Sequence, residues 1–194
     1  MTDKTLNALK ESWNQLVEMP AWNDGDKNIS SYLGSRSIND VVRSKSESDD
    51  KVIEKFQFKD YVILVFTSKY ENFYDLYIFL NDKEVAAFNW MKQGKGFWKT
   101  VSAAVSAQHQ GTGLAIKAYT HMIDKYFHTL MSDATLTGET GGKGSFDLWA
   151  KLGKIYPFKY IINKHSKNLT PVNEFTRDMM GNDFEYFVVS QVEL

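Results

Sequence analysis

The sequence predicts an α+β fold: a central, mostly antiparallel sheet with flanking helices and an N-terminal helical extension. Three observations predict it. Five runs rich in β-branched and aromatic residues lie between residues 52 and 105. The breaks between them are so short that neighbouring runs must pair as antiparallel hairpins. Helical and strand-like runs then alternate to the end of a chain of 194 residues, of which 43% are hydrophobic, enough for a sizeable core.

The N-terminal third reads differently from the rest. Residues 3–18 place apolar side chains at helical spacing, and Pro20 ends this helix. A polar stretch follows, with one short helix expected from Ser37 to Arg43 and a solvated linker from Ser44 to Asp50. We therefore expect residues 1–50 to form a helix and linker, and residues 51–194 to form the main domain.

The strands of the predicted meander come first in that domain. They are Val52–Phe58, Tyr61–Thr67, Phe73–Leu80, Glu84–Met91 and Phe97–Val105. The later elements are a helix over 114–131, a strand over 133–137, a glycine-rich loop over 138–144, a helix from an N-cap at Ser145 to a C-cap at Gly153, a strand near 160–162 and a final strand over 184–192.

A glycine-rich turn joins the fifth strand to the long helix. It reads Gln110, Gly111, Thr112, Gly113, Leu114, Ala115. Such a turn presents backbone N–H groups at the positive end of a helix dipole, and its glycines let an anion approach closely. It lacks the third glycine of a dinucleotide fingerprint and the Gly-Lys-Ser/Thr of a P-loop. The turn therefore indicates a phosphate site of another kind, and the alternative is an ordinary strand–turn–helix joint.

The pattern Gln-x-x-Gly-x-Ala, preceded by Val105-Ser106-Ala107-Gln108-His109, resembles motif A of the GNAT acyltransferase superfamily. The order of elements over residues 52–192 is also similar to that fold. The resemblance implies that the amides of the turn, from Gln110 to Ala115, hold the pyrophosphate of coenzyme A. It also implies that the backbone of Ala104, Val105 and Ser106 binds the pantetheine arm and the thioester.

The resemblance is weaker for the catalytic groups. The family often has a tyrosine within Leu-Tyr-x-Lys-Leu-Gly, where this chain has Trp149, whose indole cannot act as a general acid. Trp149 could pack against the pantetheine arm or simply fill the core. Asp133 and Glu139 bracket the expected strand beside the thioester and are the candidates for a general base, although both could be ordinary loop acids. His109 could contact a phosphate or be an exposed loop histidine.

The resemblance implies an acyl-CoA-dependent N-acyltransferase, most simply an acetyltransferase using acetyl-CoA in a ternary complex. Two departures favour an alternative, a catalytically degenerate binding or phage-particle protein. One is the tryptophan at 149, and the other is the direct succession of the first two strands, where the family has helices. The spacing of Ser132-Asp133 and Leu148-Trp149-x-x-Leu152 is also similar to GNAT proteins of tailed bacteriophages.

Composition limits the partners. The formal net charge is -1, which gives no general attraction to nucleic acid or to an anionic membrane, so a nucleobase acceptor is the weakest option. With no cysteine and four histidines, a metal site is not expected. We expect a cytoplasmic protein, in a host if viral, with an amine acceptor of unknown identity, either a small molecule or a protein. A homodimer could form through an exposed final strand.

Overall fold

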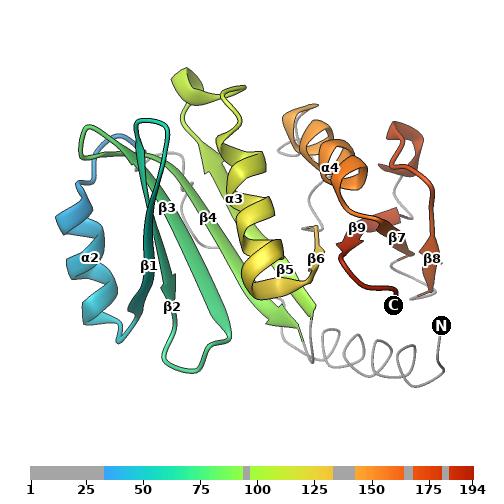
Figure 1. Cartoon of the computed structure of the whole chain (residues 1–194), viewed down its shortest axis with the longest axis horizontal. Coiled ribbons are helices and arrows are strands. Elements are labelled where there is room, and N and C mark those ends of the chain that lie inside the picture. Colours follow the sequence, from blue (N-terminus) through green and yellow to red (C-terminus); the bar gives the residue numbers. More distant parts are fainter. Residues whose placement is uncertain (1–32, 94–96, 133–142, 164–167, 181–183) are drawn as a thin grey trace. The chain divides into compact units, whose positions relative to one another are not determined.

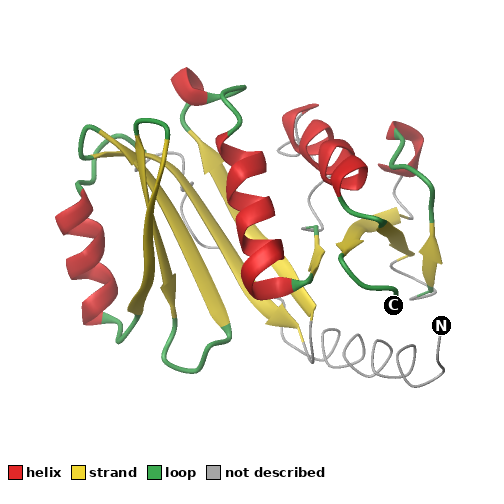
Figure 2. Cartoon of the chain, in the orientation of Figure 1, coloured by secondary structure: helices red, strands yellow, loops and turns green. Residues whose placement is uncertain are grey.

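The computed structural model describes residues 33–93, 97–132, 143–163, 168–180 and 184–194. These residues form nine strands and three α-helices, α2 (Ile38–Glu47), α3 (Leu114–Met122) and α4 (Lys143–Ile155) (Figures 1 and 2). The strands are β1 (Lys51–Phe58), β2 (Tyr61–Thr67), β3 (Phe73–Leu80), β4 (Lys83–Gln93), β5 (Phe97–Val105), β6 (Thr129–Met131), β7 (Phe158–Asn163), β8 (Leu169–Pro171) and β9 (Phe184–Ser190). The expected helix over 3–18 lies outside the described residues.

The strands hydrogen-bond in the order β1-β2-β3-β4-β5-β6-β9-β7-β8, and β5–β6 is a parallel pair. The other described pairings are antiparallel. The predicted α+β class with a mostly antiparallel sheet is therefore confirmed. β2, β3 and β5 have the predicted bounds because runs rich in β-branched and aromatic residues, separated by short breaks, fix both ends of each strand locally.

The described residues divide into two compact units. One, called here the turn unit, consists of residues 33–91 and 100–118. The other, the C-terminal unit, consists of the described residues within 92–99 and 119–194. The predicted division at residue 50 stays a prediction, because most of the residues before it are not described.

The turn unit has a core between α2 and the sheet. Alternate residues of the strands face the helix, as the period of two requires. The buried members of this cluster are Val41, Leu64, Phe66, Tyr77, Phe79 and Ala87. Ser37 caps α2 through a capping box with Asp40, whose side chain accepts a hydrogen bond from the Ser37 amide at 3.1 Å.

The prediction that α2 ends at Arg43 is wrong. The helix continues to Glu47, through residues that were expected to form a solvated linker. Two ion pairs of Lys45, with Asp50 and with Asp75 of β3, hold the last turn of the helix. The pair with Asp75 is tertiary, so local composition could not reveal it.

The C-terminal unit has its own core, built on β6, β7 and β9. Its buried residues are Phe97, Met131, Tyr160, Ile162, Val188 and Leu194. The predicted helix over 114–131 is too long. α3 ends at Met122, a π-helical segment follows over Ile123–Phe127, and His128 turns the chain with a φ of 58° into β6. The apolar run at 129–131 pairs with β5 and β9 instead of extending the helix.

Three further expectations for this unit need correction. α4 begins at Lys143, so Ser145 lies inside the helix and is not its N-cap. Gly153 also lies inside α4, where a Cβ would stand 2.9 Å from Cδ2 of Phe175; this glycine serves packing and does not cap the helix. β8 was not predicted. The final strand, β9, is paired on both sides by β6 and β7, so it is not an exposed edge through which subunits could join.

Candidate functional site: an anion-binding turn

The predicted glycine-rich turn lies within the turn unit, between β5 and α3 (Figure 1). A short 3-10 helix, Ala107–His109, precedes it. Gly111 and Gly113 both adopt positive φ angles, 77° and 90°. No atom lies within 4 Å of a Cβ built on Gly111, and the nearest to one on Gly113 is Cγ2 of Ile116 at 3.9 Å. These glycines are therefore required by backbone conformation and not by crowding.

Five consecutive backbone amides of the turn have no partner in the part of the chain that the structure describes. Among the described residues, none accepts a hydrogen bond from the amides of Gly111, Thr112, Gly113, Leu114 or Ala115. The amide of Lys117, further along α3, donates to the carbonyl of Gly113 at 3.0 Å. Gly111 and Thr112 are exposed, so the turn offers donors to solvent at the N-terminus of α3.

Two side-chain contacts fix the shape of the turn. Thr112 Oγ1 donates to the carbonyl of His109 at 2.6 Å, across the turn. Gln110 Nε2 donates to the carbonyl of Val105 at 3.3 Å, which ties the turn to the end of β5. In both contacts a side chain donates to a backbone carbonyl, so the backbone amides of the turn are not involved. The arrangement can bind an anion through several N–H groups at once.

The positions assigned to the pantetheine arm precede the turn. The amide of Ser106 donates to the carbonyl of Val85 at 2.9 Å, so β5 remains bonded to β4 at this point. A ligand that uses the Ser106 amide would have to displace that bond. Contact of Ala104, Val105 and Ser106 with a cofactor stays a prediction.

The candidate catalytic residues are not brought together by the described structure. Asp133 and Glu139 lie outside the described residues. Trp149 belongs to the C-terminal unit, where it is 2% exposed and meets the ring of Tyr119 edge-on at 6.1 Å. This burial agrees with core packing, and the role of Trp149 toward a cofactor stays a prediction.

His109 is placed differently from an exposed loop histidine. Both of its ring nitrogens are buried, and neither has a hydrogen-bond partner. The ring meets that of Tyr61 edge-on at 5.9 Å. Buried polar atoms are usually satisfied, so unpaired ones beside an anion-binding turn are notable. Sequence reasoning missed this because Tyr61 is far away along the chain.

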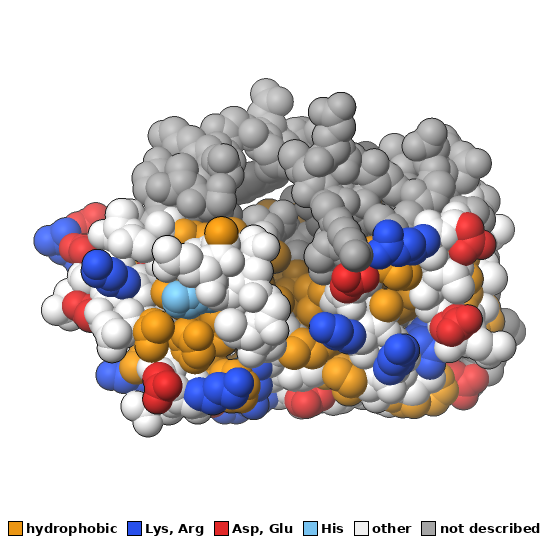
Figure 3. Space-filling model, turned by 90° about the horizontal axis from the view of Figure 1, so that it is seen from above, with side chains coloured by type: hydrophobic (Ala, Val, Ile, Leu, Met, Phe, Trp, Pro, Cys, Tyr) orange, Lys and Arg blue, Asp and Glu red, His pale blue; other side chains and the backbone are white. Residues whose placement is uncertain are grey.

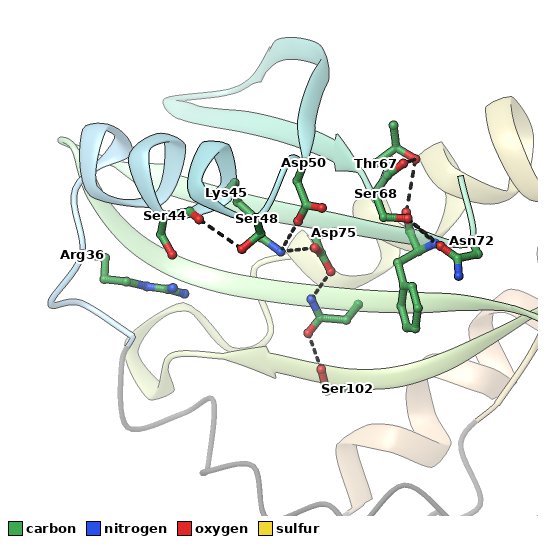
Figure 4. Close-up of polar contacts among 12 residues, drawn as sticks. Arg36, Ser44, Lys45, Ser48, Asp50, Thr67, Ser68, Asn72, Asp75 and Ser102 are labelled. Carbon is green, nitrogen blue, oxygen red and sulfur yellow. Dashed lines mark hydrogen bonds and ion pairs between the residues drawn. The ribbon is translucent and has the colours of Figure 1, made fainter. Parts of the chain in front are cut away.

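A second polar feature of the turn unit crosses its sheet on the side of α2 (Figure 4). Lys45 donates to Asp50 at 3.1 Å and also to Asp75. Asn89 donates to the other oxygen of Asp75, and Ser102 of β5 donates to Asn89. We call these five residues the polar chain. Burial lowers the pKa of Lys45, but the charge of Asp75 and the hydrogen bonds to Asp75 and Asp50 outweigh it, so the pKa is raised overall.

The described part of the chain gives two further findings. No three His, Asp or Glu side chains within it converge closely enough to hold a metal ion. None of its helices combines the length and apolar character that a bilayer crossing needs.

Comparison with known proteins gives only distant similarity. No family model matches the chain, and no curated protein matches its sequence. The structure is similar to the ribosomal-protein-S18-alanine N-acetyltransferase of Escherichia coli, at 14% identity and a TM-score of 0.41, over 64% of this chain and 72% of that one. It is similar to an acetyltransferase of Bacillus subtilis in complex with CoA, at 13% identity and a TM-score of 0.41, over 63% and 79%. It is also similar to an IAA acetyltransferase of Bacillus cereus, at 10% identity and a TM-score of 0.39, over 61% and 78%.

Proposed function

We propose that the chain binds acyl-coenzyme A through the turn at Gly111–Gly113 and transfers the acyl group, most simply acetyl, to an amine. The observation that carries the proposal is the set of five unpaired amides, from Gly111 to Ala115, at the N-terminus of α3. A diphosphate accepts hydrogen bonds from such donors and is stabilised by the helix dipole. Because the three TM-scores are below 0.5, we base the proposal on the chain's own residues.

The sequence pattern specifies the kind of phosphate ligand. Gln110, Gly113 and Ala115 match the fixed positions of motif A, which is associated with coenzyme A. The turn would hold the diphosphate, and the end of β5 would lie along the pantetheine arm. The chain's own part in the reaction would be to hold the thioester and the amine in contact, which lowers the entropic part of the barrier. Since the chain has no cysteine, a cysteinyl acyl-enzyme cannot form.

The test is calorimetric titration with acetyl-CoA and with coenzyme A. Wild-type protein should bind both, and Gly113→Val should bind neither well. Valine cannot adopt a φ of 90° without a cost of about 1–2 kcal/mol, so the amides would be re-aimed, although its Cβ meets no close atom. Gly34→Val is the matched control, because Gly34 has a φ of 88° and equally open surroundings.

The outcomes separate the possibilities. Absence of binding to wild-type protein at roughly millimolar ligand, against a typical cofactor affinity in the micromolar range, would refute the proposal. Equal loss in both glycine variants would show a general effect of strain and would also count against the turn.

A second candidate function is binding of coenzyme A without transfer. The observation that favours it is the burial of Trp149, where the family often has a tyrosine that could act as an acid. Release of free thiol from acetyl-CoA, followed over a panel of small amines and peptides, decides between the two. Turnover supports transfer, whereas tight binding without turnover supports a binding protein.

A further inference from the structure

The β1–β2 hairpin lies against both flanks of the anion-binding turn. On one flank, the ring of Tyr61 meets that of His109, the residue just before the turn, at 5.9 Å. On the other flank, Lys117 Nζ of α3 lies 5.6 Å from the centroid of the Phe58 ring. Figure 1 shows the hairpin and the end of β5 at the same end of the sheet of the turn unit. Figure 3 views that end, where basic and apolar side chains are interspersed on the described surface.

Lys59 occupies a backbone position that does not suit a lysine. Phe58 pairs with Tyr61, so Lys59 and Asp60 form a two-residue hairpin loop. Lys59 has a φ of 54°, in the left-handed region that glycine and asparagine tolerate and that costs other residues roughly 1–2 kcal/mol. Its Nζ lies 5.3 Å from the centroid of the Phe58 ring. The loop therefore has a lysine where the backbone conformation favours glycine, asparagine or aspartate.

Lys117 also breaks a local preference. It lies in the first turn of α3, where the helix dipole favours negative charge, and no acidic residue is present in that turn. Its ammonium group shares the Phe58 ring with that of Lys59. The backbone conformation disfavours Lys59 and the helix dipole disfavours Lys117, yet both lie near a turn of unpaired amides. Residues that oppose local preferences in this way are often found at functional sites.

The ring of His109 is the third side chain beside the turn, and its two nitrogens have no hydrogen-bond partner among the described residues. Both are buried and unpaired, which costs free energy unless a ligand or water satisfies them. They belong to the residue whose carbonyl anchors Thr112 of the turn. Lys59 of the hairpin loop, Lys117 of α3 and His109 before the turn thus all belong to the unit that carries the turn.

We propose that Lys59, Lys117 and His109 form a second anion subsite that binds the 3′-phosphate on the ribose of coenzyme A. This inference rests on the proposed function. The five amides suit a diphosphate, whose negative charge is shared among its non-bridging oxygens. A terminal phosphate monoester carries a higher local charge and is bound better by side-chain cations. The hairpin therefore distinguishes coenzyme A from 3′-dephospho-coenzyme A.

The experiment is calorimetric titration of the full chain with these two ligands. Wild-type protein should bind coenzyme A about tenfold more tightly than the dephospho form. Lys59→Asn should weaken coenzyme A binding about three- to fivefold and leave binding of the dephospho form unchanged. Asparagine suits the left-handed position, so this variant should be at least as stable as wild type in denaturant. Lys117→Gln should behave in the same way.

Lys69→Asn serves as the control, and His109→Phe tests the contribution of the imidazole. Lys69→Asn makes the same charge change in the β2–β3 turn, at the opposite end of β2, where Lys69 is exposed and pairs with Asp49 at 3.6 Å; it should change neither affinity. His109→Phe retains a ring against Tyr61 and removes the nitrogens, so it should weaken coenzyme A binding without loss of stability.

The results separate this inference from the proposed function. Equal affinity of wild-type protein for the two ligands would overturn the subsite alone. An effect of Lys69→Asn as large as that of Lys59→Asn would also overturn it, since the loss would then come from net charge. Failure of wild-type protein to bind either ligand would refute the proposed function and the subsite with it.

Discussion

The anion-binding turn and the polar chain belong to the same unit but use their polar groups in opposite ways. In the polar chain, the side chains of Lys45, Asp75 and Asn89 each contact at least one other member, and the chain reaches Ser102 without a gap (Figure 4). In the turn, five consecutive amides have no acceptor among the described residues. A network whose polar groups are all hydrogen-bonded stabilises the fold, whereas unpaired donors remain available to bind a ligand.

The two features also differ in how well their residues fit the local backbone. The residues of α2 obey helix preferences, from the capping box at Ser37 to Lys45 in the last turn. Around the turn, Lys59 and Lys117 oppose such preferences. Changes in the polar chain should therefore alter stability and leave ligand binding intact, and changes in the turn should do the reverse.

The largest effect is expected from Lys45→Met. Asp75 and Asp50 would lose their cation, and the Asp75 side chain is only 11% exposed. Leaving a partly buried charge unpaired should lower the free energy of unfolding by about 3 kcal/mol, measured by chemical denaturation. The double variant Lys45→Met/Asp75→Asn removes most of the unpaired charge and should recover much of the loss. Unchanged stability of the single variant would contradict the role of the polar chain.

The loss of stability caused by Lys45→Met should become smaller at alkaline pH. The folded state raises the pKa of Lys45 overall, so at alkaline pH it keeps a proton that the unfolded chain has released. The stabilisation is then fully present below the ordinary lysine pKa of about 10.4 and is lost as the pH rises beyond it. The stability difference between wild type and Lys45→Met should be constant at neutral pH and shrink above about pH 10.4.

Gly153→Ala should have the next largest effect. Its Cβ would stand 2.9 Å from Cδ2 of Phe175, a ring stacked on Phe187 with 4.4 Å between centroids. Overpacking should outweigh the better helix propensity of alanine and leave a net loss of about 1 kcal/mol in denaturation experiments. Adding Phe175→Leu makes room and should restore stability. Coenzyme A affinity should not change, in contrast to Gly113→Val. A stabilised Gly153→Ala would show that α4 has room at this position.

The strands could be predicted from the sequence because their determinants are local. Runs of β-branched and aromatic residues, bounded by short breaks, predicted the first and last residues of β2, β3 and β5. The helices could not be bounded in this way. The chain leaves α3 at His128 because residues 129–131 pair with β5 and β9, a tertiary preference that helical spacing does not reveal. α2 is longer than its composition suggests because Lys45 pairs with Asp75, 30 positions away.

In the candidate site, too, the local features could be predicted and the tertiary ones could not. The spacing of Gly111 and Gly113 between a strand and a helix predicts the turn, because it is a local pattern. The approach of the β1–β2 hairpin does not follow from any pattern, because the Tyr61–His109 and Phe58–Lys117 contacts join distant segments. One clue was present: the two-residue break at Lys59-Asp60 lacks the usual glycine or asparagine of such a hairpin.

The smallest and most specific effect is expected from Thr112→Val. The hydroxyl of Thr112 holds the turn by donating to the carbonyl of His109 at 2.6 Å, and valine has nearly the same shape without the donor. Thr112 is exposed, so stability should fall by only about 0.5 kcal/mol. Affinity for coenzyme A should fall about threefold, because the amides would need to be ordered on binding. Thr112→Ser keeps the hydroxyl and should bind like wild type. If both variants bind normally, the amides are held in place by the two glycines alone.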